Sequence, residues 1–123
     1  MTFHVMALIM TCAGCLLGLR FILAGGSVLK EWGIDATAGA LIVSRRTGVI
    51  YLGLALMFFL GRTVAPSDLR SAVCLVMGGA IALLACLGLF EFGTRRASAG
   101  IFRSVAAEAV LAGGFFWVWW DGR

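Results

Sequence analysis

A run of fifteen uncharged residues, 47–61, lies between the pair Arg45 and Arg46 and the single Arg62. At about 1.5 Å per residue a helix of this run is roughly 22 Å long, which is shorter than the roughly 30 Å hydrocarbon core of a bilayer. If the run spans a membrane, the arginines at one end must lie at the membrane edge or meet an acidic side chain inside the protein. Any fold of this chain has to meet that requirement.

The chain as a whole is too apolar for a soluble domain. Of its 123 residues, 62% are hydrophobic and 13% are charged, whereas about 25% are charged in soluble domains. Four apolar segments predict membrane spans at about residues 3–24, 38–61, 71–91 and 101–120, which take up most of a single domain, 1–123. Short connections force neighbouring spans to be antiparallel, so we expect an all-α, integral membrane, up-down-up-down four-helix bundle.

Two connections carry signals for the start of a helix. Residues 27–44 are predicted to connect the first and second spans, with Asp35 as the cap of a helix that begins near Ala36. In the next connection Ser67 or Asp68 is predicted to cap the third span.

The first span contains two short motifs. Gly14 and Gly18 form a small-xxx-small pair, which allows another helix backbone to approach closely. Cys12 and Cys15 form a CxxC motif, but it lies inside an apolar helix and not at a helix N-terminus, where the dipole activates a thiol. We therefore expect the two cysteines to be small packing residues.

Basic residues are distributed unequally between the two sides of the predicted bundle. Seven lie near the first and third connections and three near the termini and second connection. The positive-inside rule then predicts that the first and third connections are cytoplasmic and that both termini are periplasmic. The two sets are Arg20, Lys30, Arg45, Arg46, Arg95, Arg96 and Arg103 against Arg62, Arg70 and Arg123.

Tryptophans are predicted to anchor the bundle at both membrane interfaces. Trp32 lies in the first connection, and Trp117, Trp119 and Trp120 close the fourth span. Their rings are typical of the level of the lipid headgroups.

A group of polar side chains is predicted near the side of the first and third connections. Glu108 lies about seven residues into the fourth span, about 10 Å deep, where an unpaired charge costs at least a few kcal/mol. It therefore needs an arginine partner or a proton. The candidate cluster consists of Arg20, Arg45, Arg46, Tyr51, Glu91 and Glu108.

Three interpretations of this cluster stay open. It is a buried set of ion pairs that fixes helix register, a polar pocket that binds a headgroup, ion or small molecule or relays protons, or a set of groups that point separately at lipid headgroups. If Arg46 and Glu108 pair, removing Glu108 alone costs on the order of 3–5 kcal/mol and removing both charges costs much less. A double-mutant cycle measures that coupling.

Three stretches of the sequence resemble a known family. RRTGVIYLGLAL, GLFEFG and AGIFRSVAAEAVLAGGFFWVW are similar to small bacterial four-helix membrane proteins, a domain of unknown function that is distantly DoxX-like. The resemblance implies a four-helix bundle in a bacterial inner membrane and implies no particular activity. The thiol and oxidative-stress systems linked to DoxX relatives supply no pattern that carries over to Cys12 and Cys15. The resemblance is carried by Arg46, Gly48, Tyr51, Gly53, Glu91, Gly100 and Glu108.

The sequence contains no recognisable catalytic set. We see no phosphate-binding loop, Ser-His-Asp arrangement or paired catalytic acids, so no catalytic residue, metal site or cofactor is predicted. The net charge of +4 indicates anchoring at the lipid surface and not nucleic-acid binding. We expect a non-enzymatic membrane protein that is an accessory or scaffolding subunit or a homo-oligomer. The alternatives are a small carrier or lipid-binding protein that uses the polar cluster, and a membrane thiol or quinone redox protein.

Overall fold

The computed structural model describes residues 2–95 and 97–121, so Arg96 and Arg123 of the charge count lie outside the described residues. All the regular secondary structure in the described part is helical, and it contains no strand. Four of its helices are long and apolar enough to cross a membrane, which is consistent with a multi-pass membrane protein. The elements are α1 (Phe3–Leu23), α2 (Gly25–Glu31), α3 (Ala38–Leu60), α4 (Asp68–Gly93), the single 3₁₀ turn η1 (Ala99–Ile101) and α5 (Phe102–Asp121).

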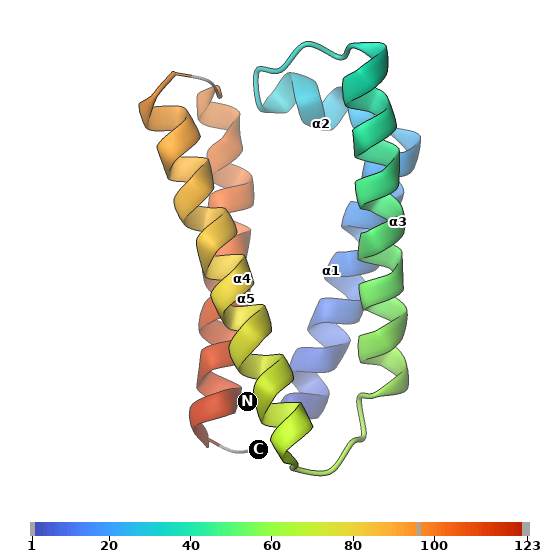
Figure 1. Ribbon diagram of the computed structural model, residues 1–123, viewed down its shortest axis with the longest axis vertical. Coiled ribbons are helices and arrows are strands. Elements are labelled where there is room, and N and C mark those ends of the chain that lie inside the picture. The colour runs from blue at the N-terminus through green and yellow to red at the C-terminus, as the bar shows by residue number, and fades with distance from the viewer. Residues whose placement is uncertain (1, 96, 122–123) are drawn as a thin grey trace.

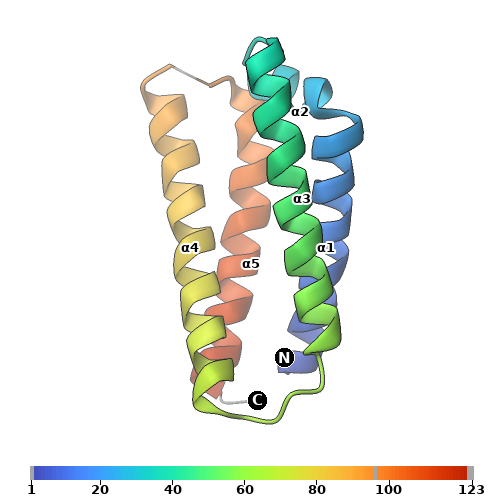
Figure 2. The same cartoon turned by 45° about the vertical axis from the view of Figure 1, so that its right-hand side comes forward.

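The four long helices form two antiparallel pairs. Helix α1 packs along α3, and α4 packs along α5 (Figures 1 and 2). The pairs converge at the end that holds both termini and the α3–α4 connection, and they diverge toward the opposite end, where α2 lies (Figure 1). The predicted all-α, up-down-up-down bundle is confirmed, with two tight pairs that spread apart at one end.

Helix α3 contains residues 47–60 of the uncharged run and extends beyond the run at the N-terminal end, so the helix is longer than the run. It has 23 residues and is therefore about 34 Å long, enough to cross the hydrocarbon core. Arg45 and Arg46 lie about two turns inside its N-terminal end, and both are exposed on the outside of the bundle. From there the long side chains reach the membrane edge by extending along the helix surface.

Hydroxyl side chains cap three of the helices. Thr37 Oγ1 accepts a hydrogen bond from the Ala40 backbone N–H at 3.1 Å, so the cap predicted at Asp35 is wrong by two residues. Helix α3 begins at Ala38, which agrees with the start of the predicted span 38–61. Ser67 caps α4 by accepting from the Arg70 N–H at 3.1 Å, which confirms one of the two predicted caps. Thr37 and not Asp35 caps α3, because the Thr37 hydroxyl reaches a free backbone N–H in the first turn of the helix.

Helix α2 is an element that the sequence analysis did not predict, because residues 27–44 were expected to be a connection. Helix α1 ends at Leu23, where the Ser44 hydroxyl of α3 donates a 2.8 Å hydrogen bond to the carbonyl of Phe21. The chain then turns into α2, which lies across the open end of the bundle (Figure 1). Its Val28 and Leu29 are buried, so this short helix is held by apolar contacts.

Glycines bring α1 and α3 into backbone contact. A Cβ atom added to Gly48 would lie 2.6 Å from the Gly18 carbonyl oxygen, and one added to Gly14 would lie 2.9 Å from the Tyr51 carbonyl oxygen. Only a hydrogen atom fits at these positions. The predicted packing role of Gly14 and Gly18 is confirmed, and Gly48 is the matching position on the partner helix.

Large side chains close the bundle at the terminal end. Phe115 and Met6 are almost completely buried, and the Phe115 ring lies 5.5 Å from the Phe58 ring in a tilted arrangement. All four long helices contribute, so this is where the two pairs are joined. The buried residues of this core are Phe3, Met6, Ala7, Met10, Phe58, Cys74, Ile81, Ala112, Phe115 and Val118.

We predict that Gly48→Leu destabilises the protein, because its side chain would force α1 and α3 apart; overpacking of this kind costs about 1–3 kcal/mol. Gly53→Leu is the matched control, since a Cβ there meets no atom within 4 Å. Thermal unfolding in mild detergent, followed by circular dichroism, measures both. Equal melting temperatures for the two variants would contradict the close approach of α1 and α3.

Candidate functional site

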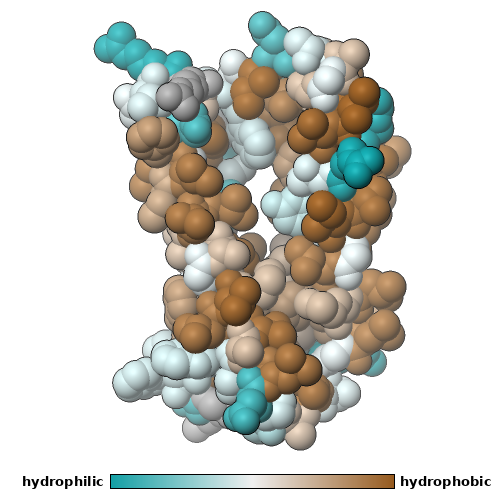
Figure 3. Space-filling model, in the orientation of Figure 1, coloured by the Kyte–Doolittle hydropathy of each residue, from teal (hydrophilic) through white to brown (hydrophobic). Residues whose placement is uncertain are grey.

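A cavity of about 310 Å³ lies between the two helix pairs. We call it the inner cavity; inward-facing side chains of all four long helices and Trp32 line it. It occupies the half of the molecule toward α2, where the space-filling view shows a gap between the pairs (Figure 3). Apolar side chains make up most of its wall.

Differences in side-chain size explain why the cavity is there. Ala13, Ala80 and Ala107 face the gap between the pairs. Near the terminal end Phe58 and Phe115 fill the corresponding space. Small side chains on three helices leave a volume that larger ones would close, because a helix pair cannot collapse locally without bending.

Glu108 is the carboxyl group in the wall of the inner cavity. It is the seventh residue of α5 and lies on the same face as Ser104 and Leu111, one turn to either side. Its Oε2 atom is buried and has no hydrogen-bond partner in the described part of the chain. Unsatisfied polar atoms of this kind are rare in native proteins and call for a specific explanation.

Three aromatic rings from three elements form one wall of the inner cavity. Phe21 stacks on Tyr51 at a centroid distance of 5.6 Å and meets Trp32 edge to face at 5.9 Å. The Trp32 indole N–H donates to the Ser104 hydroxyl at 3.2 Å. Trp32 was predicted to be an interfacial anchor, but this hydrogen bond and its partial burial turn it toward the inside of the protein.

A second cavity, of about 280 Å³, adjoins the first near α2, and we call it the outer cavity. Trp32, Leu84, Ser104 and Glu108 line both cavities, so Glu108 is reached from the two of them. Glu91 adds a second carboxyl group to the wall of the outer cavity. The two cavities together extend from the neighbourhood of α2 toward the middle of the bundle.

Glu31 at the end of α2 ties the two helix pairs together. Arg20 of α1 donates to Glu31 Oε2 at 2.5 Å, and Arg103 Nη1 of α5 lies 3.7 Å from Oε1. The Ser98 hydroxyl donates to the Glu31 backbone carbonyl at 2.7 Å, and the Ser98 N–H donates to the Trp32 carbonyl at 2.8 Å. Helix α2 is therefore fixed to both sides of the open end.

The six residues of the predicted polar cluster do not form one cluster. Tyr51 and Glu108 line the inner cavity, and Glu91 lines the outer one. Arg20 pairs with Glu31, while Arg45 and Arg46 face outward. The pairing considered between Arg46 and Glu108 is not made among the described residues, because Glu108 Oε2 has no partner.

Sequence reasoning missed Glu31, Ser104 and Phe21 as site residues. Ser104 lies four residues before Glu108, so helical spacing would have placed it on the same face. Glu31 is an acid at the end of the bundle where most arginines gather, and that charge excess was an available signal. Phe21 had no signal, because it lies in a helix that is apolar on every side.

The remaining predicted residues lie on the outside of the bundle. Cys12 and Cys15 are both exposed, so the expected packing role inside the bundle is wrong for them. Trp117, Trp119 and Trp120 are exposed near the C-terminal end of α5, where they remain predicted interface anchors. Neither group contacts the inner cavity.

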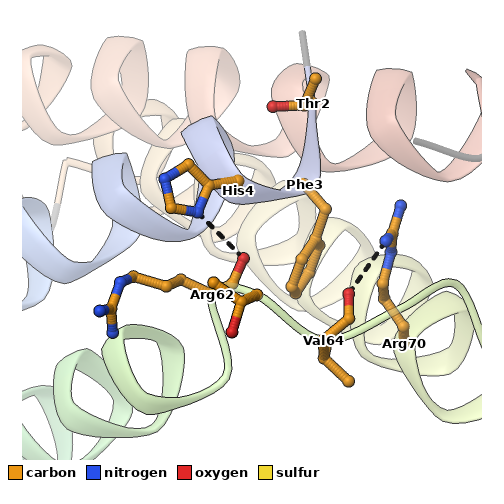
Figure 4. Close-up of a pocket in the computed structure, with 7 residues that line it drawn as sticks. Thr2, Phe3, His4, Arg62, Val64 and Arg70 are labelled. Carbon is orange, nitrogen blue, oxygen red and sulfur yellow. Dashed lines mark hydrogen bonds between the residues drawn. The ribbon is translucent and has the colours of Figure 1, made fainter.

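A basic groove at the terminal end is a second place where polar side chains gather (Figure 4). His4 Nδ1 lies 3.2 Å from the Arg62 carbonyl oxygen, and Arg70 Nη1 donates to the Val64 carbonyl at 3.2 Å. The Arg70 guanidinium also lies 4.8 Å from the centre of the Phe3 ring. The side chain of Arg62 points away from Arg70, so the two guanidinium groups do not converge on one ligand (Figure 4). These contacts tie the α3–α4 connection to α1.

No protein-family model matches this chain, and neither a curated protein nor a solved structure matches it.

Two double-mutant cycles compare the ion pair between Arg20 and Glu31, which the structure shows, with the pair between Arg46 and Glu108, which it does not show. We predict that Arg20→Met and Glu31→Gln are coupled by roughly 1 kcal/mol, since the Arg20 side chain is 42% exposed and the Glu31 side chain 15%. Arg46→Leu and Glu108→Leu should be additive within about 0.5 kcal/mol because the two groups do not meet. Thermal unfolding in detergent measures all six variants. Strong coupling in the second cycle would contradict the placement of Arg46.

Proposed function

We propose that this protein is a non-enzymatic, multi-pass membrane protein that binds a small amphiphilic molecule in the inner cavity. The observation that carries the proposal is the buried Glu108 Oε2 atom, which faces a cavity and has no partner among the described residues. A group left in this state within a protein wall costs free energy unless something satisfies it. A bound molecule with a polar end would do so.

The chemistry of the wall supports an amphiphile and not a fully polar ligand. Ligand sites are typically apolar cavities with a few well-placed polar groups. Here Glu108, Tyr51 and Ser104 are at the α2 side of the inner cavity, and aliphatic side chains such as Leu54 and Leu111 lie deeper. The gap between the pairs gives an apolar body a route from the side of the bundle (Figure 3).

We further propose that the protein resides in a bacterial inner membrane, with the α2 end in the cytoplasm and both termini on the periplasmic side. The excess of basic residues at the α2 end supports this orientation through the positive-inside rule. Lys30, Arg45, Arg46 and Arg103 are all at that end. The resemblance to small bacterial four-helix membrane proteins supports the choice of membrane.

The role of an accessory subunit or homo-oligomer stays a prediction. Its support is the outward-facing apolar surface, which includes Leu16, Leu23, Leu60 and Val110. Lipid covers such a surface as well as a partner helix would, because both are equally apolar. The cavity favours the binding role, since lipid contact alone gives no reason for a buried carboxyl group.

We predict that Ala107→Phe abolishes binding in the inner cavity, because the added ring fills it. Ala109→Phe is the matched control, as this residue is exposed on the same helix and lines neither cavity. With Trp117, Trp119 and Trp120 changed to Phe, Trp32 is the sole tryptophan and reports on the cavity. Binding is measured as saturable quenching of its emission by the neutral probe N-phenyl-1-naphthylamine. The proposal predicts quenching with the control variant and loss of quenching with Ala107→Phe; equal behaviour of both variants would overturn it.

A further inference from the structure

The charged groups around the two cavities are strongly biased in sign. Glu108 lines both cavities and Glu91 lines the outer one. None of the described residues that line either cavity is Lys, Arg or His, although the chain has a net charge of +4. A positively charged ligand therefore meets no basic group in these walls, and an anionic ligand meets at least one carboxyl group.

No described arginine is hydrogen-bonded to the buried Oε2 atom of Glu108. Arg20 and Arg103 both interact with Glu31, which lies on α2. Arg45 and Arg46 face outward from α3. A carboxylate in an apolar wall is stabilised most by a cation close to it. Because the described arginines are placed elsewhere, Glu108 needs either a proton of its own or a positive charge supplied by a bound molecule.

The three aromatic rings suit an organic cation. Phe21, Trp32 and Tyr51 line the inner cavity together with Glu108. Ammonium groups are attracted to the faces of aromatic rings, and cages of such rings with an acid recognise quaternary amines in other proteins. A hard metal ion needs about six oxygen ligands. Only four side chains of the inner cavity carry oxygen atoms among the described residues: Thr47, Tyr51, Ser104 and Glu108. The inner cavity therefore suits an organic cation better than a hard metal ion.

The size of the site limits the ligand to a compact molecule. The inner cavity has about 310 Å³, which suits a small aryl or short alkyl body joined to one charged nitrogen. We propose that the inner cavity binds hydrophobic organic monocations, amines or quaternary ammonium compounds, with the charged nitrogen at Glu108 and the apolar body along α1 and α4. This inference rests on the proposed binding function and adds the chemical class of the ligand.

The outer cavity gives the charged group a polar route to the site. Trp32 lies at the boundary of the two cavities and is held by its hydrogen bond to Ser104. Glu31 fixes α2 next to this boundary through Arg20 and Arg103. The outer cavity thus leads a cation from the α2 side to Glu108.

The test compares benzyltrimethylammonium with neopentylbenzene, its neutral isostere, on the full chain in mild detergent. Trp32 is again the sole tryptophan, and its emission reports binding of either compound. We expect the cation to bind at least about tenfold more tightly than the isostere. In Glu108→Gln the affinity for the cation should fall about tenfold, while that for the isostere stays the same and shows that the cavity is intact. Asp68→Asn removes an exposed carboxyl group at the far end and should change neither affinity.

The possible results separate the ligand class from the binding function. Equal affinities for the cation and the isostere, or an unchanged cation affinity in Glu108→Gln, would overturn the proposed ligand class and leave cavity binding intact. Binding of neither compound, with no quenching by N-phenyl-1-naphthylamine, would overturn the binding function itself. Loss of both affinities in Glu108→Gln would mean that Glu108 supports the cavity structure, and would also overturn its role in charge recognition.

Discussion

The structure depends on where charge is placed in a chain that is mostly apolar. A charged side chain inside a bilayer costs several kcal/mol unless it is paired or reaches water. Arg45 and Arg46 meet this constraint by facing outward near the end of α3, and Arg20 meets it by pairing with Glu31. The Oε2 atom of Glu108 does not meet this constraint in either way, because it is buried and has no partner among the described residues.

Packing divides the bundle into a closed end and an open end. At the terminal end Phe58 and Phe115 from opposite helix pairs meet in a shared core. Toward α2 three of the positions that face the gap hold alanine, and the pairs separate around the inner cavity. The ion pairs of Glu31 join the pairs again at the far end, so the cavity is bounded by a packed core on one side and by α2 on the other.

This arrangement concentrates the polar chemistry of the protein at one place. Trp32, Ser104 and Glu108 line both cavities, and Glu31, next to Trp32, pairs with Arg20 and Arg103. The two acids differ in their surroundings: Glu31 joins the helix pairs through its ion pairs, whereas Glu108 Oε2 has no partner among the described residues.

The sequence by itself determined the four apolar helices, a cap at Ser67 or Asp68 and the close approach at Gly14 and Gly18. These follow from hydrophobicity, local hydrogen bonding and residue size, which act over a few residues. The tertiary structure decided that Arg20 pairs with Glu31, that α2 forms, and that Trp32 turns inward. Helices that are apolar all round carry no signal for which face points inside. The choice of face depends on how side-chain volumes match between helices, as with Ala107 opposite the α1–α3 pair, and no single segment contains that information.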